Sequence, residues 1–366
     1  MNGITRIRHS HMSLPLIIVF SVIAWCQAGV PDGSPVREEE MDVSRDDVRL
    51  SGTLTLPVGE GPFPVVVLIS GSGPQNRDWD FDWNGEYLMG RILANDLARH
   101  GIAVFRYDDR GTGKSTGQGE DIRDLTQDVL HIVESLQKKT AIGPVGLCGH
   151  SLGAAVALHT AAACDGIDFL ILLSPPLVTG KEIMLAQARE MPDMYRSSRE
   201  QTNEEASLDG MEFVRSIADV SGDDQAREKA ISIFVKIFRY HSANSKADDQ
   251  STGNDAEERL RKDAQNLVEH FRSPANQFFL HYDPVSDLKG VACPIAVLFG
   301  EGDRHVKLDV NLKPLLDGVT QSTISNFTLK VVPEINHFYT CPPHRTKGKM
   351  YPGVTDFLGR WILNSI

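Results

Sequence analysis

The sequence predicts an α/β protein with a mostly parallel, doubly wound sheet and an inserted helical lid. Short apolar runs alternate along the chain with segments of helical spacing, which is the pattern of a sheet covered by helices on both faces. Several of these runs are apolar throughout, as expected of strands that are buried on both sides. Between residues 181 and 272 the alternation stops, and the chain becomes charged, rich in Met and helical. Because long insertions are often functional, we expect this one to form a lid.

Each element of the alternation has its own signal. The segment at residues 49–57 alternates polar and apolar side chains, whereas "FPVVVLIS" at residues 63–70 is continuously apolar. The helical spacing of "RILANDLARHG" ends on a Gly, which is a helix stop signal. The expected strands are residues 49–57, 63–70, 102–108, 144–149, 168–174, 294–300 and 327–333. The expected helices are residues 91–101, 126–137, 152–163 and 354–365.

The composition indicates a globular protein and argues against nucleic acid as a partner. The chain has 366 residues, of which 41% are hydrophobic, and its formal net charge is −12. This hydrophobic content supplies a sizeable core. Binding to a phosphate backbone needs clustered positive charge, which an excess of acidic residues disfavours.

The N-terminus has the pattern of a secretory signal peptide. Arg6 and Arg8 precede an apolar run at residues 14–25, and the small Ala28 follows as a cleavage point. The run is shorter than the roughly 20 residues that span a bilayer. We therefore expect an exported protein, periplasmic or secreted, with no stable membrane insertion after cleavage; an uncleaved anchor is the alternative. The expected division is a signal peptide at 1–28, a first core part at 29–180, a lid at 181–285 and a second core part at 286–366.

Four cysteines would remain after cleavage: Cys148, Cys164, Cys293 and Cys341. None stands in a C-x-x-C or Cys/His spacing typical of a metal site. Cys148 and Cys293 lie at or near predicted strands, where burial is expected. An exported protein permits disulfides, but the spacing does not determine how these cysteines would pair.

Two segments match G-x-S-x-G, the pattern around a hydrolase nucleophile: "GKSTG" with Ser115 and "GHSLG" with Ser151. The first is also similar to the end of a phosphate-binding loop, but that loop requires Gly where Asp108 stands. A nucleophile turn needs a strand directly before the Ser and a helix directly after it. Only Ser151 has both, because "PVGLC" precedes it and an Ala-rich helix follows. Ser151 is therefore the candidate nucleophile, and Ser115 is expected in a loop where Arg110 holds an ion pair.

A serine nucleophile needs a base to take its proton, and the base needs an orienting acid. In hydrolases with this strand–turn–helix nucleophile, the three residues follow in the order Ser, acid, His. Asp303 comes just after the predicted strand at 294–300, and His337 comes just after the strand at 327–333. The alternatives are Glu301 and Asp309 for the acid, and His305 and His344 for the base.

The oxyanion of a tetrahedral intermediate needs two hydrogen-bond donors. One is expected from the backbone N–H of Leu152, at the start of the helix after the nucleophile. The other is expected from the loop "GSGP" that follows the strand at 63–70, where we choose the N–H of Ser72 over that of Gly73. A plain turn is the alternative interpretation of this loop.

Together these segments resemble a known family. "LISGSGPQNRD", "YDDRGTGKST", "GHSLG", "FFLHYDPVSDLKGVACPIAVLFGEGDRHV" and "EINHFY" are similar to segments of exported bacterial α/β-hydrolases of the serine-aminopeptidase-like or acyl-ester hydrolase family. The resemblance spans about residues 49–362. It implies the α/β-hydrolase fold, a triad of Ser151, Asp303 and His337, and a lid. Relatives usually have Gly-Pro-Gln-Asp-Arg-Asp in the first of these segments, where this chain has Asn76.

We therefore expect a serine hydrolase that cleaves carboxylic esters through an acyl-enzyme on Ser151, with a small ester or short peptide as substrate and with no metal or cofactor. A serine aminopeptidase-type peptidase is the alternative, and it would need an acidic group to hold the amine of its substrate. A catalytically silent binding protein of the same fold is a further alternative. In the lid, six apolar residues could line an acyl pocket or only pack the lid's own core. They are Met184, Met191, Met194, Tyr195, Phe234 and Phe238.

Overall fold

The computed structural model describes most of the chain after residue 35. The described residues are 16–19, 36–80, 87–119, 121–218, 224–244, 254–324, 326–340 and 350–366. Of the predicted signal peptide, only Leu16–Val19 falls among them, as the strand β1. Cys341 and His344 lie outside the described residues.

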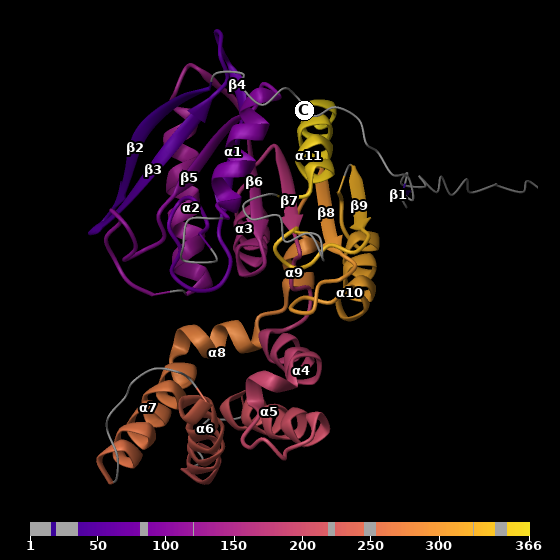
Figure 1. The fold of residues 1–366 in the computed structure, drawn as a ribbon. Helices are drawn as coiled ribbons and strands as arrows, with labels where there is room; N and C mark the ends of the chain where they lie inside the picture. The colour runs from indigo at the N-terminus through magenta and orange to yellow at the C-terminus, as the bar shows by residue number, and fades with distance from the viewer. Residues whose placement is uncertain are drawn as a thin grey trace, which may run out of the picture.

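A mostly parallel sheet forms the core of the upper part of the molecule as drawn in Figure 1. Its strands lie in the order β1-β9-β8-β7-β6-β4-β5-β3-β2. In this spatial order, every pair of neighbouring strands between β1 at one edge and β5 is parallel. The strand β3, in contrast, pairs antiparallel with both β5 and β2. Every strand predicted from the sequence is present, so the predicted fold class is confirmed. The bounds are β2 Arg37–Arg45, β3 Val48–Leu56, β4 Phe63–Ile69, β5 Ala103–Tyr107, β6 Ile142–His150, β7 Phe169–Leu173, β8 Ile295–Gly300 and β9 Phe327–Val332.

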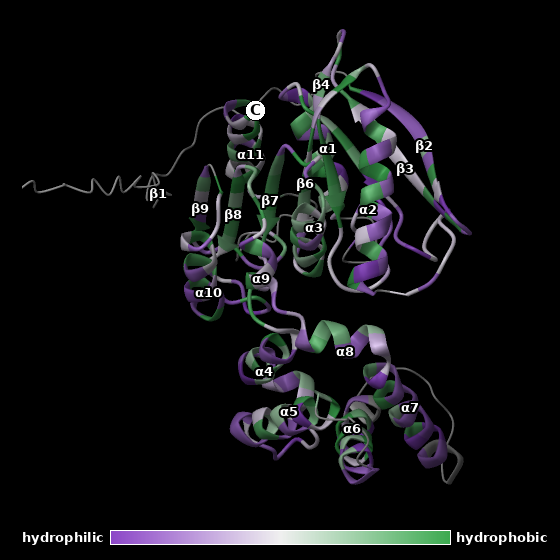
Figure 2. Cartoon of the chain, turned by 180° about the vertical axis from the view of Figure 1, so that it is seen from behind, coloured by the Kyte–Doolittle hydropathy of each residue, from purple (hydrophilic) through white to green (hydrophobic). Residues whose placement is uncertain are grey.

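Helices cover both faces of this sheet. On β4, Val66 and Leu68 join the buried cluster under α1 and α11, whereas Val65 and Val67 join the cluster under α2 and α3. Burial on both faces explains why central strands such as β7 and β8 are continuously apolar, as Figure 2 shows. The helices are α1 Met89–Arg99, α2 Ile122–Gln137, α3 Leu152–Ala163, α9 Pro284–Leu288, α10 Leu308–Thr320 and α11 Pro352–Ser365. Among the helices that the structure describes, none has the length and apolar character needed to cross a bilayer.

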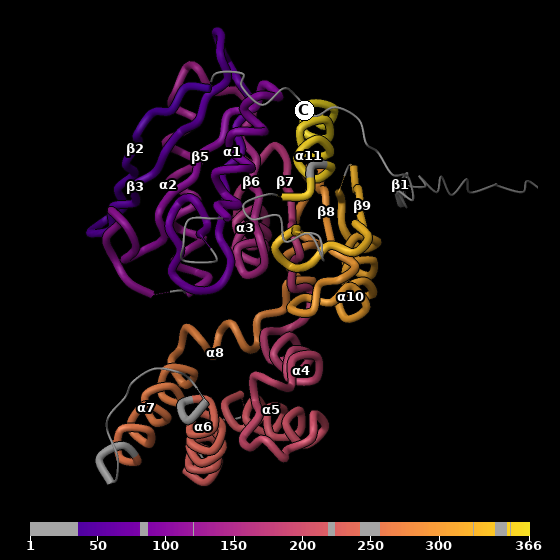
Figure 3. Tube along the Cα trace, viewed as in Figure 1, coloured from indigo at the N-terminus to yellow at the C-terminus, as the bar shows by residue number. Residues whose placement is uncertain are grey.

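The helical insertion predicted between two core strands is also present. The chain leaves β7, passes through the helices of the lid and returns through α8 and α9 to β8 (Figure 3). The lid has a small core of its own, which includes Phe213, Ile217 and Ile231. It begins after β7, on the carboxyl side of the sheet, where ligands bind in open α/β sheets. Its helices are α4 Gly180–Glu190, η1 Pro192–Tyr195, α5 Asn203–Ala218, α6 Asp224–Asn244, α7 Asn254–Arg272 and α8 Pro274–His281.

Two elements lacked a clear sequence signal. The strand β2 has the sequence "REEEMDVSR", and Val43 is its only fully buried residue. It lies at the edge of the sheet, so its charged side chains face solvent and give it no apolar pattern. The helix α10 contains Pro314, a residue that normally indicates a helix boundary rather than an interior.

Candidate active site

Ser151 lies in a strained turn between β6 and α3. Its backbone has φ 55° and ψ −121°, a conformation that residues with a side chain rarely adopt and that is retained mainly at functional sites. The flanking glycines permit the close packing around it. A Cβ at Gly149 would lie 2.1 Å from the carbonyl oxygen of Gly153, and a Cβ at Gly153 would lie 2.1 Å from the carbonyl oxygen of Ser70. The turn predicted for "GHSLG" is therefore present, with its serine at the carboxyl edge of the sheet.

Asp303 and His337 form a buried pair at the same edge. Asp303 follows β8 and His337 follows β9, and Nδ1 of His337 lies 2.8 Å from Oδ2 of Asp303. The other carboxylate oxygen accepts the backbone N–H groups of His305 at 2.8 Å and Val306 at 2.9 Å. Burial alone would raise the pKa of Asp303, but the hydrogen bond and charge of His337, together with the N–H of Val306, lower it overall. Asp303 is therefore held as a carboxylate that fixes the imidazole.

The residue before Ser151 connects the nucleophile turn to this pair. Nε2 of His150 lies 2.9 Å from the carbonyl oxygen of His337, and the centroids of the two imidazole rings are 4.7 Å apart. Burial, followed by the charge of His337, lowers the pKa of His150 to about 3. A neutral His150 thus donates to the loop that carries His337. Nothing in the sequence indicates this contact, because the two residues lie far apart along the chain.

The alternative acids and bases occupy less suitable positions. Asp309 is exposed in the first turn of α10, where it pairs with Lys307 at 3.4 Å, and Glu301 is also exposed. His305 stacks on His337 with 4.9 Å between ring centroids, and its hydrogen bond to Asp303 is made by its backbone N–H. The structure therefore brings together the acid and base that the sequence order favours.

The loop expected to supply an oxyanion donor passes directly over Ser151. A Cβ at Gly71 would lie only 3.3 Å from the Cβ of Ser151. Ser72 is exposed, and its carbonyl oxygen accepts a hydrogen bond from Nε2 of Gln75 over 3.2 Å. Leu152 is the first residue of α3, where backbone N–H groups have no partner within the helix. Both predicted donors therefore belong to segments that border the nucleophile turn.

The chain also matches a known family by sequence. The sequence model of the family Hydrolase_4, described as serine aminopeptidase, S33, matches residues 88–339. This is more than half of the chain, and it includes Ser151, Asp303, His337 and the lid. The chain belongs to the Hydrolase_4 family. The loop at residues 71–74 lies before the matched region.

Curated proteins similar to this Hydrolase_4 member are an esterase and lipases. The chain is 30% identical over 168 residues to Esterase EstD of Thermotoga maritima, which covers 45% of this chain and 39% of that protein. It is 37% identical over 94 residues to monoglyceride lipase of Homo sapiens, which covers 25% of this chain and 31% of that protein. The chain thus spans less than half of the length of these relatives.

Solved structures show the same architecture at lower identity. An esterase of Pyrococcus furiosus has a TM-score of 0.54 and 16% identity, covering 90% of this chain and 92% of that chain. Est1E of Butyrivibrio proteoclasticus, with ferulic acid bound, has a TM-score of 0.50 and 17% identity, covering 89% and 98%. Likeness at this identity shows the fold alone. The protein is thus an α/β-hydrolase of the Hydrolase_4 family with esterase and monoglyceride lipase relatives.

A cavity of about 520 Å³ lies beside the nucleophile turn of this Hydrolase_4 chain. Its inner wall includes Gly71 from the loop over Ser151, and Leu152 and Val156 from α3. The loop after β5 supplies a second wall. The lid contributes His270, Ser273, Ala275 and Asn276, at the junction of α7 and α8. A volume of this order is usual for a small-molecule site.

The lid residues that we considered for an acyl pocket do not line this cavity. Met184, Tyr195 and Phe234 pack against the lid's own core. Met194 and Phe238 are 55% and 42% exposed. The pocket-lining interpretation is therefore wrong for this cavity, because helical spacing reveals an apolar face but not what that face contacts. The short turn at residues 270–276 gave no apolar signal and was missed.

Ser115 is a structural residue of the loop after β5, as predicted. Its Oγ donates to the carbonyl oxygen of Asp108 over 2.7 Å and accepts the backbone N–H of Ser51 over 2.9 Å. The ion pair predicted for Arg110 is also confirmed, since its guanidinium lies 2.8 Å from Oδ1 of Asp128. Both residues stabilise the loop.

Three cysteines fall within the described residues, and each is a free thiol: Cys148, Cys164 and Cys293. Cys148 is fully buried in β6, and its burial raises the pKa of the thiol. Cys293 is only partly buried, and burial raises its pKa to about 11. The thiols of Cys148 and Cys293 are therefore protonated and unreactive near neutral pH. Within the described residues, no group of three or more His, Cys, Asp or Glu is arranged to hold a metal ion.

Proposed function

We propose that the protein is a serine carboxylesterase with Ser151 as nucleophile, His337 as base and Asp303 as orienting acid. The observation that carries the proposal is the buried pair of Asp303 and His337, joined over 2.8 Å and linked through His150 to the strained turn of Ser151. The nucleophile, the acid and the base thus each lie in a separate turn or loop at the same edge of the sheet. Esterase and lipase relatives support ester bonds as the target.

The hydrogen bond to Asp303 determines which ring nitrogen of His337 acts as the base. With its Nδ1–H donated to the carboxylate, the imidazole has Nε2 free to accept a proton. Nε2 takes the proton of the Ser151 hydroxyl as Oγ bonds to the carbonyl carbon of the ester. The carbonyl oxygen becomes an oxyanion, which accepts hydrogen bonds from the N–H groups of Leu152 and Ser72.

Collapse of this intermediate releases the alcohol and leaves an acyl group on Ser151. The C–O bond to the alcohol breaks, and the departing oxygen takes the proton from His337. A water molecule then gives a proton to His337 and bonds to the acyl carbon. The acid is released as Oγ of Ser151 recovers its proton, and the enzyme returns to its initial state.

The cavity indicates which part of the ester it receives. The departing oxygen must lie near His337 in order to be protonated, whereas the cavity is bounded by Gly71 and Leu152, on the oxyanion side. We therefore assign the acyl group to the cavity. Leu125, Leu152 and Val156 offer apolar contact, and the lid wall of His270, Ser273 and Asn276 is polar. This combination suits a short or medium acyl group better than a long alkyl chain.

The peptidase alternative needs a carboxylate that faces the substrate's amine. Asp109 is the only acidic residue that lines the cavity among the described residues. Its oxygens accept hydrogen bonds from Oγ of Ser70 and the N–H of Gln75. This engagement favours ester substrates over peptides with a free N-terminus.

An activity panel tests the proposal directly. The purified protein is assayed on nitrophenyl esters from acetate to decanoate and on aminoacyl nitroanilides, and is treated in parallel with a fluorophosphonate probe. We expect labelling and ester hydrolysis, with the ester kcat/KM well above that of the amides. Preference for the amides would support the peptidase instead, and labelling without turnover of either class would support a silent binding protein.

We also propose that the protein is exported after cleavage behind Ala28. The support is the order of Arg6 and Arg8, an apolar run and a small residue. Mass spectrometry of the protein recovered from expressing bacterial cells should find a chain that begins at residue 29 outside the cytoplasm. An intact N-terminus in the cytoplasm would contradict export.

A further inference from the structure

The loop at residues 71–74 has no regular structure of its own to hold it over Ser151. It contains two glycines, and Gly73 has a φ of 86°, in the left-handed region. Its position therefore depends on its contacts with neighbouring segments, including those at its two ends. An oxyanion donor acts only if its N–H is fixed where the charge develops. The residues that fix these ends thus determine whether the loop can contribute to catalysis.

One residue, Asp109, contacts both ends. Oγ of Ser70, just before the loop, lies 2.9 Å and 2.7 Å from the two carboxylate oxygens of Asp109. The backbone N–H of Gln75, just after the loop, donates to Oδ2 of Asp109 over 2.9 Å. In return, the N–H of Asp109 donates to the carbonyl oxygen of Gln75 over 2.9 Å. The side chain and the backbone of Asp109 thus hold the two ends of the loop together.

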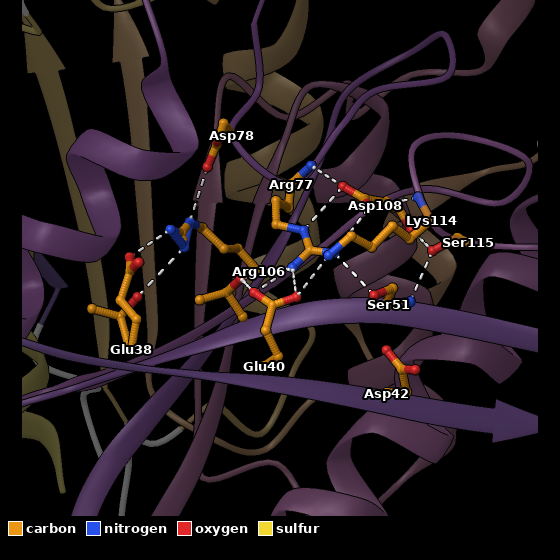
Figure 4. Close-up of polar contacts among 12 residues, drawn as sticks. Glu38, Glu40, Asp42, Ser51, Arg77, Asp78, Arg106, Asp108, Lys114 and Ser115 are labelled. Carbon is orange, nitrogen blue, oxygen red and sulfur yellow. Dashed lines mark hydrogen bonds and ion pairs between the residues drawn. The ribbon is translucent and has the colours of Figure 1, made fainter.

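Asp109 is itself attached to the rigid centre of the protein. It follows β5, which pairs in parallel with β4, the strand that leads into the loop. The preceding residue, Asp108, accepts hydrogen bonds from Arg77: its backbone N–H at 2.9 Å, its Nε at 3.1 Å and its terminal nitrogen at 2.9 Å. Figure 4 shows this guanidinium between Asp108 and Glu40, with Ser51 beside it. The chain beyond the loop is therefore anchored as well.

The contacts with Arg77 also determine the charge of Asp108. Burial alone would raise the pKa of Asp108, but its hydrogen bonds with Arg77 and the N–H of Lys114 lower it overall. Asp108 is thus an anion whose charge is balanced by Arg77 rather than by the loop at 71–74. Asp109, in contrast, bonds to both residues that frame that loop, Ser70 and Gln75.

We propose that Asp109 is the positioning residue of the oxyanion hole. By bonding to Ser70 and Gln75, it holds the N–H of Ser72 over the carbonyl oxygen of an ester attacked by Ser151. The proposal rests on the proposed esterase function. It gives Asp109 no contact with the reacting atoms, so its removal affects the transition state through the geometry of the loop.

The test compares Asp109→Ala with Asp109→Asn in the full chain. Asn keeps an oxygen for the N–H of Gln75 and an amide that can donate to Ser70, whereas Ala has neither. Loss of one oxyanion donor costs about 10²–10³ in kcat. We therefore expect Asp109→Ala to lower kcat by about 10²-fold with little change in KM. Asp109→Asn should recover most of that loss.

Two further measurements separate positioning from a loss of stability. A phenylboronic acid inhibitor forms a tetrahedral adduct with a catalytic serine, so its affinity should fall by a factor similar to that of kcat in Asp109→Ala. Thr328→Val is the control, because Thr328 is buried and accepts a hydrogen bond from Nε1 of Trp361 over 3.1 Å rather than bonding to Ser70 or Gln75. It should lower the melting temperature and leave kcat and boronate affinity close to wild type.

The outcomes distinguish this proposal from the proposed function. If wild type hydrolyses esters and binds the boronate while Asp109→Ala matches it in both, the positioning role is wrong and the esterase stands. A rise in KM with unchanged kcat would also overturn the role, as would an equal loss of kcat in the Thr328→Val protein. If wild type neither hydrolyses esters nor binds the boronate, the esterase function itself fails, and the role of Asp109 fails with it.

Discussion

Nε2 of His150 lies 2.9 Å from the carbonyl oxygen of His337. The two residues are far apart in the sequence, and this contact joins the strand that ends at the nucleophile turn to the loop that carries the base. Nδ1 of His337 is at the same time bound to Asp303 over 2.8 Å. His337 is therefore held at its backbone carbonyl by His150 and at its ring by Asp303, as a preorganised base requires.

The first prediction distinguishes the two serines of the G-x-S-x-G segments. Ser151→Ala should abolish labelling by a fluorophosphonate probe, because it removes the attacking oxygen. Ser115→Ala should keep the labelling but unfold more easily. It leaves the buried N–H of Ser51 without its partner, which costs about 1–3 kcal/mol. Gel fluorescence and thermal melting of both variants check this, and persistent labelling of Ser151→Ala would exclude Ser151 as the nucleophile.

The second prediction concerns the acid. Asp303→Asn should fold and yet lose about 10⁴ in kcat, because the amide no longer holds His337 in the tautomer that accepts a proton. Asp309→Asn is the matched control, since Asp309 is exposed and pairs with Lys307 at the surface. Steady-state kinetics with a nitrophenyl ester measures both. A greater loss in Asp309→Asn would assign the acid to α10 instead.

The third prediction is a dependence of stability on pH. His150 has a pKa of about 3 in the folded protein, lowered by burial and by the charge of His337, whereas a free histidine has a pKa of about 6.5. Below about pH 6.5 the unfolded chain binds a proton that the folded chain excludes. The free energy of unfolding should therefore decrease with falling pH, by about 1.4 kcal/mol per pH unit from this residue.

His150→Gln tests that slope, because Gln keeps an N–H donor for the carbonyl oxygen of His337 but does not titrate. Urea unfolding of both proteins between pH 7 and pH 4.5 should show a slope that is smaller in the variant by about one proton. Equal slopes would mean that His150 does not account for acid sensitivity.

The fourth prediction concerns the acyl group. Ala275→Phe adds a ring to the lid wall of the cavity, so it should reduce kcat/KM on octanoyl esters far more than on acetyl esters. A change of about 10-fold or more in the ratio is expected, since one methylene in an apolar pocket is worth about 1–3 kcal/mol. Phe238→Ala is the control, because Phe238 is 42% exposed and does not line the cavity. A change of ratio in Phe238→Ala alone would place the acyl group elsewhere on the lid.

The sequence by itself determined the fold and the order of the candidate triad. Continuous apolar runs such as "FPVVVLIS" predict strands buried on both faces, because such a strand presents successive side chains to the helices on either side of the sheet. The strand before Ser151 and the helix after it distinguish that serine from Ser115, because a nucleophile turn is a local structure with a local signal. Asp303 and His337 were predicted because each comes just after a strand, and the carboxyl ends of these parallel strands lie at the same edge of the sheet.

Only the tertiary structure decided which side chains meet across long separations. The partners of His150 and Asp109 stand on other strands and loops, and such pairs leave no periodic pattern in the sequence. The apolar residues of the lid show the same limit, since Phe234 packs into the lid core whereas Phe238 is exposed, although both lie on α6. Edge strand β2 was missed because its charged side chains bind Arg77 and Arg106 rather than forming an apolar face. Local propensity and hydrophobic period thus specify the elements, while burial against distant residues specifies the site.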